Sequence, residues 1–227
     1  MVDGQVSGAQ SERRIAALDV GTNSLRLIVA EASPDGSYRV IDDEKVIVRL
    51  GQGLATTGRL AEDRIEAAAE AIDHLRDIAQ GYQVEELRAV ATAAVREAPN
   101  GPDLVAVVRD RSGVELRVIS AAEEARLSYR SVDNAFSIRH RNTVIADIGG
   151  GSTEILLSVG GVVDRVYLLK LGAVRLTEMF GPCETEEQFE MMRSYVRDHL
   201  KEHVDRPPFG ADLMFGTGGT FTAVAGM

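Results

Sequence analysis

Short apolar runs alternate with amphipathic stretches along the chain of 227 residues. A short apolar run bounded by turn residues predicts a strand, whereas apolar positions three and four residues apart predict a helix. The clearest helical pattern spans residues 61–80, and Gly81 is expected as the C-terminal cap of this helix. A small-residue loop is predicted before it, at residues 51–58. The predicted strands are residues 14–19, 25–32, 38–49, 87–91, 115–119, 143–147, 153–157, 162–169 and 213–215. The other predicted helices are residues 103–111, 120–134, 174–180 and 185–204, with a further helix entered through residues 216–220.

One segment of this pattern occurs twice in the sequence. Residues 15–29 read as a strand, an acidic residue, a small-residue turn and a second strand, and residues 143–157 repeat that design. In this repeat Asp147 corresponds to Asp19, which lies 128 residues earlier in the sequence. The order of elements after each copy predicts one duplicated α/β unit, with mixed sheets flanked by helices.

Composition narrows the class of protein. An apolar content of 44% suits a globular core, and a net charge of −10 argues against a general nucleic-acid binder. Cys183 is the only cysteine, so an intramolecular disulfide is excluded. Residues 1–13 are expected to form a disordered tail, and no apolar stretch is long enough to span a membrane. The simplest location is the cytoplasm.

The repeated loops carry the strongest chemical signal. Three consecutive glycines, Gly149 to Gly151, separate Asp147 from Glu154, and close approach of the backbone to a ligand would explain them. Such a turn can wrap a phosphate while the flanking carboxylates hold Mg²⁺. The alternative is a plain glycine-rich hairpin. Residues 216–219 form a third glycine-rich turn, which either binds a ligand at a helix start or only joins a strand to a helix.

A carboxylate between the two copies is the candidate base. Ser120 and Glu123 fit a capping box, which leaves the neighbouring Glu124 without a capping role. Arg96 follows a buried strand and could offer a forked donor to phosphate oxygens. Further arginines could form a basic track for a polyanion, although surface charge is the simpler interpretation of each. These are Arg126, Arg130, Arg139 and Arg141.

Four segments together resemble the exopolyphosphatase/guanosine pentaphosphate phosphohydrolase (Ppx/GppA) family of the acetate kinase–Hsp70–actin–sugar kinase superfamily. The segments are residues 19–24, 91–96, 119–126 and 147–154. The resemblance implies two ribonuclease H-like (actin-like ATPase) lobes, residues 14–134 and 135–227, around an interlobe cleft. Because family chains continue past the third glycine motif, the second lobe is expected to be incomplete.

The resemblance also assigns roles. It implies that Glu124 is the general base and that Asp147 and Glu154 organise Mg²⁺. It implies that Asn23, Arg96 and Ser152 contact phosphate. The two loops add the further phosphate-binding candidates Thr22, Ser24, Gly149, Gly150, Gly151 and Thr153. Candidates for an additional ligand loop, which the resemblance does not itself assign, are Asp19, Gly216, Thr217, Gly218 and Gly219.

The implied activity is Mg²⁺-dependent hydrolysis of the terminal phosphoanhydride of inorganic polyphosphate. Two alternatives stay open, removal of the terminal phosphate of guanosine pentaphosphate and non-catalytic binding of polyphosphate or alarmone nucleotides. The resemblance leaves a homodimer open and implies no nucleic-acid or membrane partner.

Overall fold

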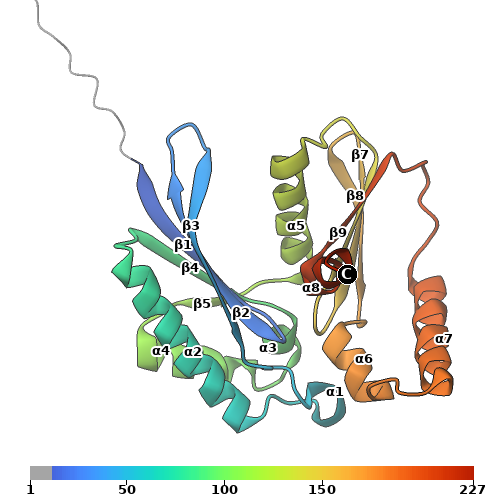
Figure 1. Ribbon diagram of the computed structural model, residues 1–227, viewed down its shortest axis with the longest axis horizontal. Helices are drawn as coiled ribbons and strands as arrows, with labels where there is room; N and C mark the ends of the chain where they lie inside the picture. Colours follow the sequence, from blue (N-terminus) through green and yellow to red (C-terminus); the bar gives the residue numbers. More distant parts are fainter. Residues whose placement is uncertain (1–11) are drawn as a thin grey trace, which may run out of the picture.

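The computed structural model describes residues 12–227, which fold into two sheets with helices (Figure 1). The first sheet has the strand order β3-β2-β1-β4-β5 and the second has the order β8-β7-β6-β9. The strands are β1 (Arg13–Val20), β2 (Ser24–Ala32), β3 (Tyr38–Ile47), β4 (Glu86–Ala91), β5 (Leu116–Val118), β6 (Thr143–Ile148), β7 (Thr153–Val159), β8 (Val162–Leu169) and β9 (Leu213–Thr217). The helices are α1 (Leu54–Thr57), α2 (Glu62–Gly81), α3 (Ala93–Glu97), α4 (Gly101–Ser112), α5 (Ala121–Phe136), α6 (Ala173–Phe180), α7 (Glu186–His203) and α8 (Gly218–Ala225).

The duplicated unit is visible in the strand pairing. β1 pairs antiparallel with β2 and parallel with β4, and β6 pairs in the same way with β7 and β9. Asp19 and Asp147 therefore occupy equivalent places near the ends of the two central strands. The predicted duplication of one α/β unit is confirmed.

The first lobe holds the larger core. Buried side chains of β1 and β2, such as Leu18 and Leu27, pack with Leu75 of α2 and Leu104 of α4. The apolar stripe predicted for residues 61–80 is the buried face of α2. These helices cover the face of the first sheet that is turned away from the second lobe (Figure 1).

Helix α5 packs on the second sheet rather than the first. Its residues Ala125, Tyr129 and Val132 form one core with Ile145 and Leu156. The sequence-based boundary between residues 134 and 135 separates this helix from the sheet that it covers, so the structural division lies before α5. Local periodicity gives the buried face of a helix but not the sheet that covers it.

Several local predictions need correction. The expected loop at 51–58 contains α1, and the five-residue α3 has no sequence-based counterpart. Gly81 is the last residue of α2, and Tyr82 takes the cap position. The predicted tail lies outside the described residues except for its end, where Arg13 already begins β1.

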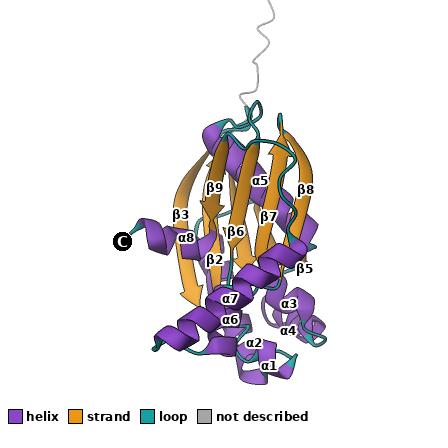
Figure 2. Ribbon diagram, turned by 90° about the vertical axis from the view of Figure 1, so that its right-hand side faces the viewer, coloured by secondary structure: helices purple, strands orange, loops and turns teal. Residues whose placement is uncertain are grey.

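The N-terminus of α5 has one of the two hydrogen bonds of the predicted capping box. The Ser120 hydroxyl accepts a hydrogen bond from the Glu123 amide at 3.2 Å. The Glu123 carboxylate does not return to the cap, because it pairs with Arg117 at 2.7 Å. Figure 2 shows the second sheet face-on, in front of the first, with α7 running diagonally across the lower part of the view. Within residues 12–227, no helix is both long and apolar enough to cross a membrane.

Candidate active site

The two repeated loops close in the same way. The Gly21 amide donates to the Ser24 carbonyl at 3.2 Å, and the Gly149 amide donates to the Ser152 carbonyl at 3.0 Å. Within the described residues, the amides between these bonds donate no hydrogen bond. These amides belong to Thr22, Asn23, Gly150, Gly151 and Ser152. Backbone amides left free in a tight turn are the donors that an anion such as phosphate accepts from.

The loops also touch one another, which gives the glycines a second role. A Cβ on Gly151 would lie 2.9 Å from Thr22 Oγ1, and a Cβ on Gly150 would lie 3.2 Å from Thr22 Cβ. Thr22 is buried in this contact. The triple glycine was predicted from approach to a ligand, whereas the structure shows that approach of the first lobe also requires it.

One predicted phosphate ligand, Thr153, is engaged elsewhere, and the backbone of another, Asn23, fixes its loop. The Thr153 hydroxyl donates to the Leu171 carbonyl, which favours a structural role for this side chain. The Asn23 carbonyl accepts from the amides of Val48 and Arg49, at 3.1 and 2.8 Å, and this fixes the first loop against the end of β3. The half-buried side chains of Asn23 and Ser24 remain candidates.

The predicted metal carboxylates lie side by side. Asp147 on β6 is opposite Glu154 on β7 and Thr217 on β9, so all three side chains lie on one face of the sheet. Glu154 is only 5% exposed, and its Oε1 atom has no partner. The buried Thr217 Oγ1 atom has none either. Unpartnered buried oxygens next to a carboxylate suit a hard cation with its bound waters.

A residue that the sequence interpretation missed holds Asp147 in place. The Ser128 hydroxyl donates to Asp147 Oδ2 at 2.9 Å. Ser128 follows Glu124 by four residues on α5, so the two side chains lie on the same side of that helix. This spacing is the signal that could have identified Ser128.

The candidate base is paired with the candidate phosphate ligand. Arg96 Nη1 donates to Glu124 Oε2 at 2.8 Å and to the Ile119 carbonyl at 3.1 Å. Burial raises the pKa of Glu124, the hydrogen bond and charge of Arg96 lower it, and the charge of Asp147 raises it, with a net upward shift. The structure therefore brings together two residues that lie 28 positions apart in the sequence.

Burial and neighbouring carboxylates raise two further pKa values. Burial, followed by the charge of Glu124, raises the pKa of Glu154 to about 7. Desolvation by the surrounding protein, followed by the charges of Glu124 and Asp147, raises the pKa of Asp19 to about 6, although Asp19 itself is exposed. A site with this many carboxylates repels a polyanion unless cations neutralise it.

The donor set fits a cation that keeps much of its own hydration. Among residues 12–227, no three His, Cys, Asp or Glu side chains gather closely enough to form a metal cage. Mg²⁺ is typically held by one or two carboxylates, with waters and substrate phosphates completing its shell. Asp147 and Glu154, with the orphaned Glu154 oxygen, match that pattern.

The third glycine turn lies directly against this centre. Gly218 has a φ of +86°, and a Cβ there would lie 2.7 Å from Asp147 Oδ1 and 2.5 Å from the Ile148 carbonyl. Glycine at 218 therefore lets the start of α8 approach Asp147. Gly216 is explained by packing alone, since a Cβ there would lie 2.3 Å from the Phe221 ring.

The predicted basic track does not assemble around Glu124. At about 100° per helical residue, Arg126 and Arg130 lie on roughly the opposite side of α5 from Glu124. Arg139 pairs with the buried Asp133 at 2.7 Å. Arg96, by contrast, is hydrogen-bonded to the candidate base.

Comparisons with known proteins agree with this geometry. The model of the Ppx/GppA phosphatase family matches residues 27–227. Exopolyphosphatase 2 of Mycobacterium tuberculosis is 34% identical over 225 residues, which cover 94% of this chain and 70% of that protein.

Two solved structures are similar over most of the chain. The exopolyphosphatase of Cytophaga hutchinsonii has a TM-score of 0.86 and 27% identity, covering 95% of this chain and 70% of that one. The Aquifex aeolicus member of the Ppx/GppA family has a TM-score of 0.75 and 33% identity, covering 95% and 69%. The predicted fold class and family resemblance are confirmed.

Proposed function

Because the chain belongs to the Ppx/GppA phosphatase family, we propose that it is an exopolyphosphatase, a hydrolase that releases orthophosphate from the end of inorganic polyphosphate. The observation that carries the proposal is the pairing of Glu124 with Arg96, at 2.8 Å, beside the two loops with free amides. The pairing supplies a base and a phosphate ligand at one point.

The terminal phosphate would lie between the two loops. The free amides and the Arg96 guanidinium would donate to its oxygens and neutralise charge that develops during transfer. Asp147 and Glu154 would hold a divalent cation, which we propose to be Mg²⁺. When bound, this cation supplies positive charge against the phosphates and the carboxylates.

Glu124 would accept a proton from the attacking water. The water oxygen forms a bond to the terminal phosphorus while the bridging P–O bond breaks, and the electron pair leaves with the shortened polyphosphate. A carboxylate with a raised pKa is a stronger base than an ordinary glutamate, and Arg96 keeps it ionised before substrate arrives. Ser128 would hold Asp147 in a fixed orientation through its hydrogen bond.

Phosphate release from two substrates tests the proposal. The protein with Mg²⁺ is given polyphosphate in one reaction and guanosine pentaphosphate in another, and orthophosphate is measured over time. Faster turnover of polyphosphate supports an exopolyphosphatase, whereas faster turnover of guanosine pentaphosphate supports the alternative phosphohydrolase. Tight binding of polyphosphate without release from either substrate would contradict both hydrolase assignments. The cytoplasmic location and the homodimer remain predictions.

A further inference from the structure

Helix α3 of the first lobe is joined to the second lobe through two adjacent side chains. Arg96 reaches Glu124 on α5, as described above. Glu97, the next residue, accepts from Arg175 Nη2 on α6 at 2.6 Å. The short helix that carries the proposed phosphate ligand is therefore bonded to two different elements of the second lobe.

Arg175 also forms a hydrogen bond with the triple-glycine loop. Arg175 Nε donates to the Gly151 carbonyl at 3.0 Å. One planar guanidinium thus joins Glu97 of the first lobe to the loop of the second lobe. Arginine suits this double contact because its donors form a rigid fork, whereas lysine offers a single charged centre.

The start of α6 fixes the rest of that loop. The amides of Ala173 and Val174 donate to the carbonyls of Gly149 and Gly150, at 3.0 and 2.9 Å. Gly172 permits the close approach, since a Cβ there would lie 2.3 Å from the Gly150 carbonyl oxygen. All three glycine carbonyls are consequently held by α6, which leaves the amides of Gly150 and Gly151 for an anion.

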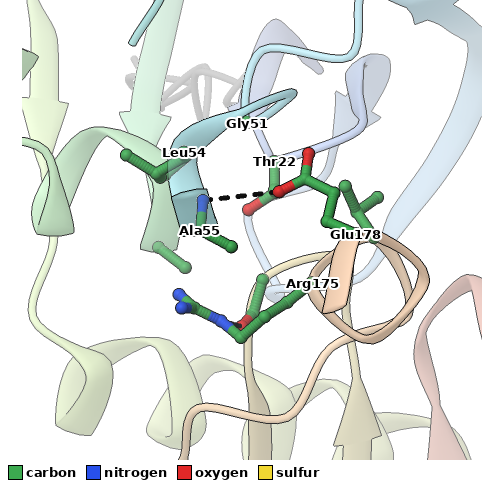
Figure 3. Close-up of a pocket in the computed structure, with 10 residues that line it drawn as sticks. Thr22, Gly51, Leu54, Ala55, Arg175 and Glu178 are labelled. Atoms are coloured by element: carbon green, nitrogen blue, oxygen red, sulfur yellow. Dashed lines mark hydrogen bonds between the residues drawn. The ribbon is translucent and has the colours of Figure 1, made fainter. Parts of the chain in front are cut away.

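A second bond ties α6 to the first lobe. The Glu178 carboxylate accepts from the Gly53 amide at 2.6 Å and from the Ala55 amide at 3.3 Å, at the start of α1. Figure 3 shows Arg175 and Glu178 projecting from the same helix toward first-lobe residues, around a cavity of about 10 Å³, the size of one water molecule. These contacts leave little free volume between α6 and the first lobe.

We propose that Arg175 is a positioning residue, which sets the placement of α3 relative to the triple-glycine loop and thereby the placement of Arg96 and Glu124. This inference rests on the proposed function. Arg175 acts through Glu97 and Gly151, not by contact with Glu124. Its side chain is 17% exposed and that of Glu97 is 24% exposed, so loss of either partner leaves a half-buried charge unpaired.

Steady-state kinetics on polyphosphate test the positioning role. We expect Arg175→Gln to lower kcat by about 10- to 100-fold, the range that misplacement of a catalytic group by about 1 Å produces, with KM changed by less than about threefold. Arg175→Lys should recover part of kcat, because it retains a charge for Glu97. The double variant with Glu97→Gln should be less impaired than the product of the single effects. Arg193→Gln, which removes an exposed pair with Glu190, is the matched control and should leave both constants unchanged.

An interlobe distance provides a readout that does not depend on activity. Spin labels are attached at the exposed positions Ser37 and Val162, with Cys183 replaced by Ser. Pulsed electron paramagnetic resonance then measures the separation of the two lobes. We expect one narrow distance distribution for the otherwise unaltered protein and a broader or displaced one for Arg175→Gln and Arg175→Lys. Arg193→Gln should retain the narrow distribution.

The outcomes distinguish the proposed function from the positioning role of Arg175. A parent protein that hydrolyses neither polyphosphate nor guanosine pentaphosphate would refute the proposed function, while the distance measurement would still test the link through Arg175. An active parent whose Arg175→Gln and Arg175→Lys variants retain kcat would overturn the positioning role, whatever the distance. A fall in kcat with an unchanged distance distribution would also overturn it, since interlobe placement would then not be the cause. If Arg175→Gln does not fold, Arg175→Lys decides by the same criteria.

Discussion

Replacing Glu154 with Gln should stabilise the protein at alkaline pH when divalent cations are absent. Glu154 is buried with one unpartnered oxygen, and its pKa is about 7 against 4.5 for an ordinary glutamate. Between pH 4.5 and about 7, the folded protein holds a proton that the unfolded chain has released. Stability therefore falls as pH rises through this window, and the cost is complete above about pH 7.

The gap between these pKa values sets the size of the effect. At about 1.4 kcal/mol for each pKa unit, it corresponds to roughly 3 kcal/mol. Glutamine has nearly the same shape and no charge, so Glu154→Gln should raise the free energy of unfolding by up to about 3 kcal/mol at pH 8 and by little at pH 4. Urea denaturation in the presence of EDTA, at pH 8 and at pH 4, measures this difference in the free energy of unfolding.

The control for this comparison is Glu70→Gln, a change of an exposed glutamate in the middle of α2. It should change the free energy of unfolding by less than about 0.5 kcal/mol at either pH. Adding Mg²⁺ should stabilise the protein with Glu154 intact and have a smaller effect on Glu154→Gln, because binding to the folded state alone raises stability. A Glu154→Gln variant that is less stable at pH 8, or equally affected at both pH values, would refute the reasoning.

Three further substitutions test the contact between the loops and the hydrogen bond to Asp147. Gly151→Ala should lower kcat by about 10- to 100-fold, because its Cβ would meet Thr22 Oγ1 at 2.9 Å and displace the loops. Gly149→Ala, whose Cβ meets only the Ser152 carbonyl at 3.5 Å, should cost much less, and equal losses in these two variants would argue against the interlobe contact. Ser128→Ala should lower kcat by about two- to tenfold, since one hydrogen bond to a carboxylate orients Asp147, and an unchanged kcat would remove Ser128 from the site.

Much of the fold was predictable because its signals are local. Short apolar runs bounded by turn residues identified the strands, and the repeat at Asp19 and Asp147 identified the duplication. The short helices α1 and α3 span four and five residues, too few to establish a helical period. The packing of α5 on the second sheet depends on contacts between distant segments, which no local pattern contains.

The sequence predicted only part of the candidate site. The loops, the glycines and the flanking carboxylates are local features, and the resemblance added the role of Glu124. Neither gave the contact of Thr22 with Gly151 or the bond from Arg175 to Glu97, since both join residues that are far apart in sequence. The sequence also indicated that glycines were required at 150 and 151 without indicating that the first lobe is what approaches them.

The proposed role of Glu124 is the central claim, and one variant tests it most directly. Glu124→Gln retains the size of the side chain and removes the base, so release of orthophosphate from saturating polyphosphate should fall by about 10²- to 10⁴-fold. Binding of polyphosphate, measured on the same preparation, should persist because the loop amides and Arg96 remain. Phosphate release by Glu124→Gln at a rate close to that of the unaltered protein would contradict the account.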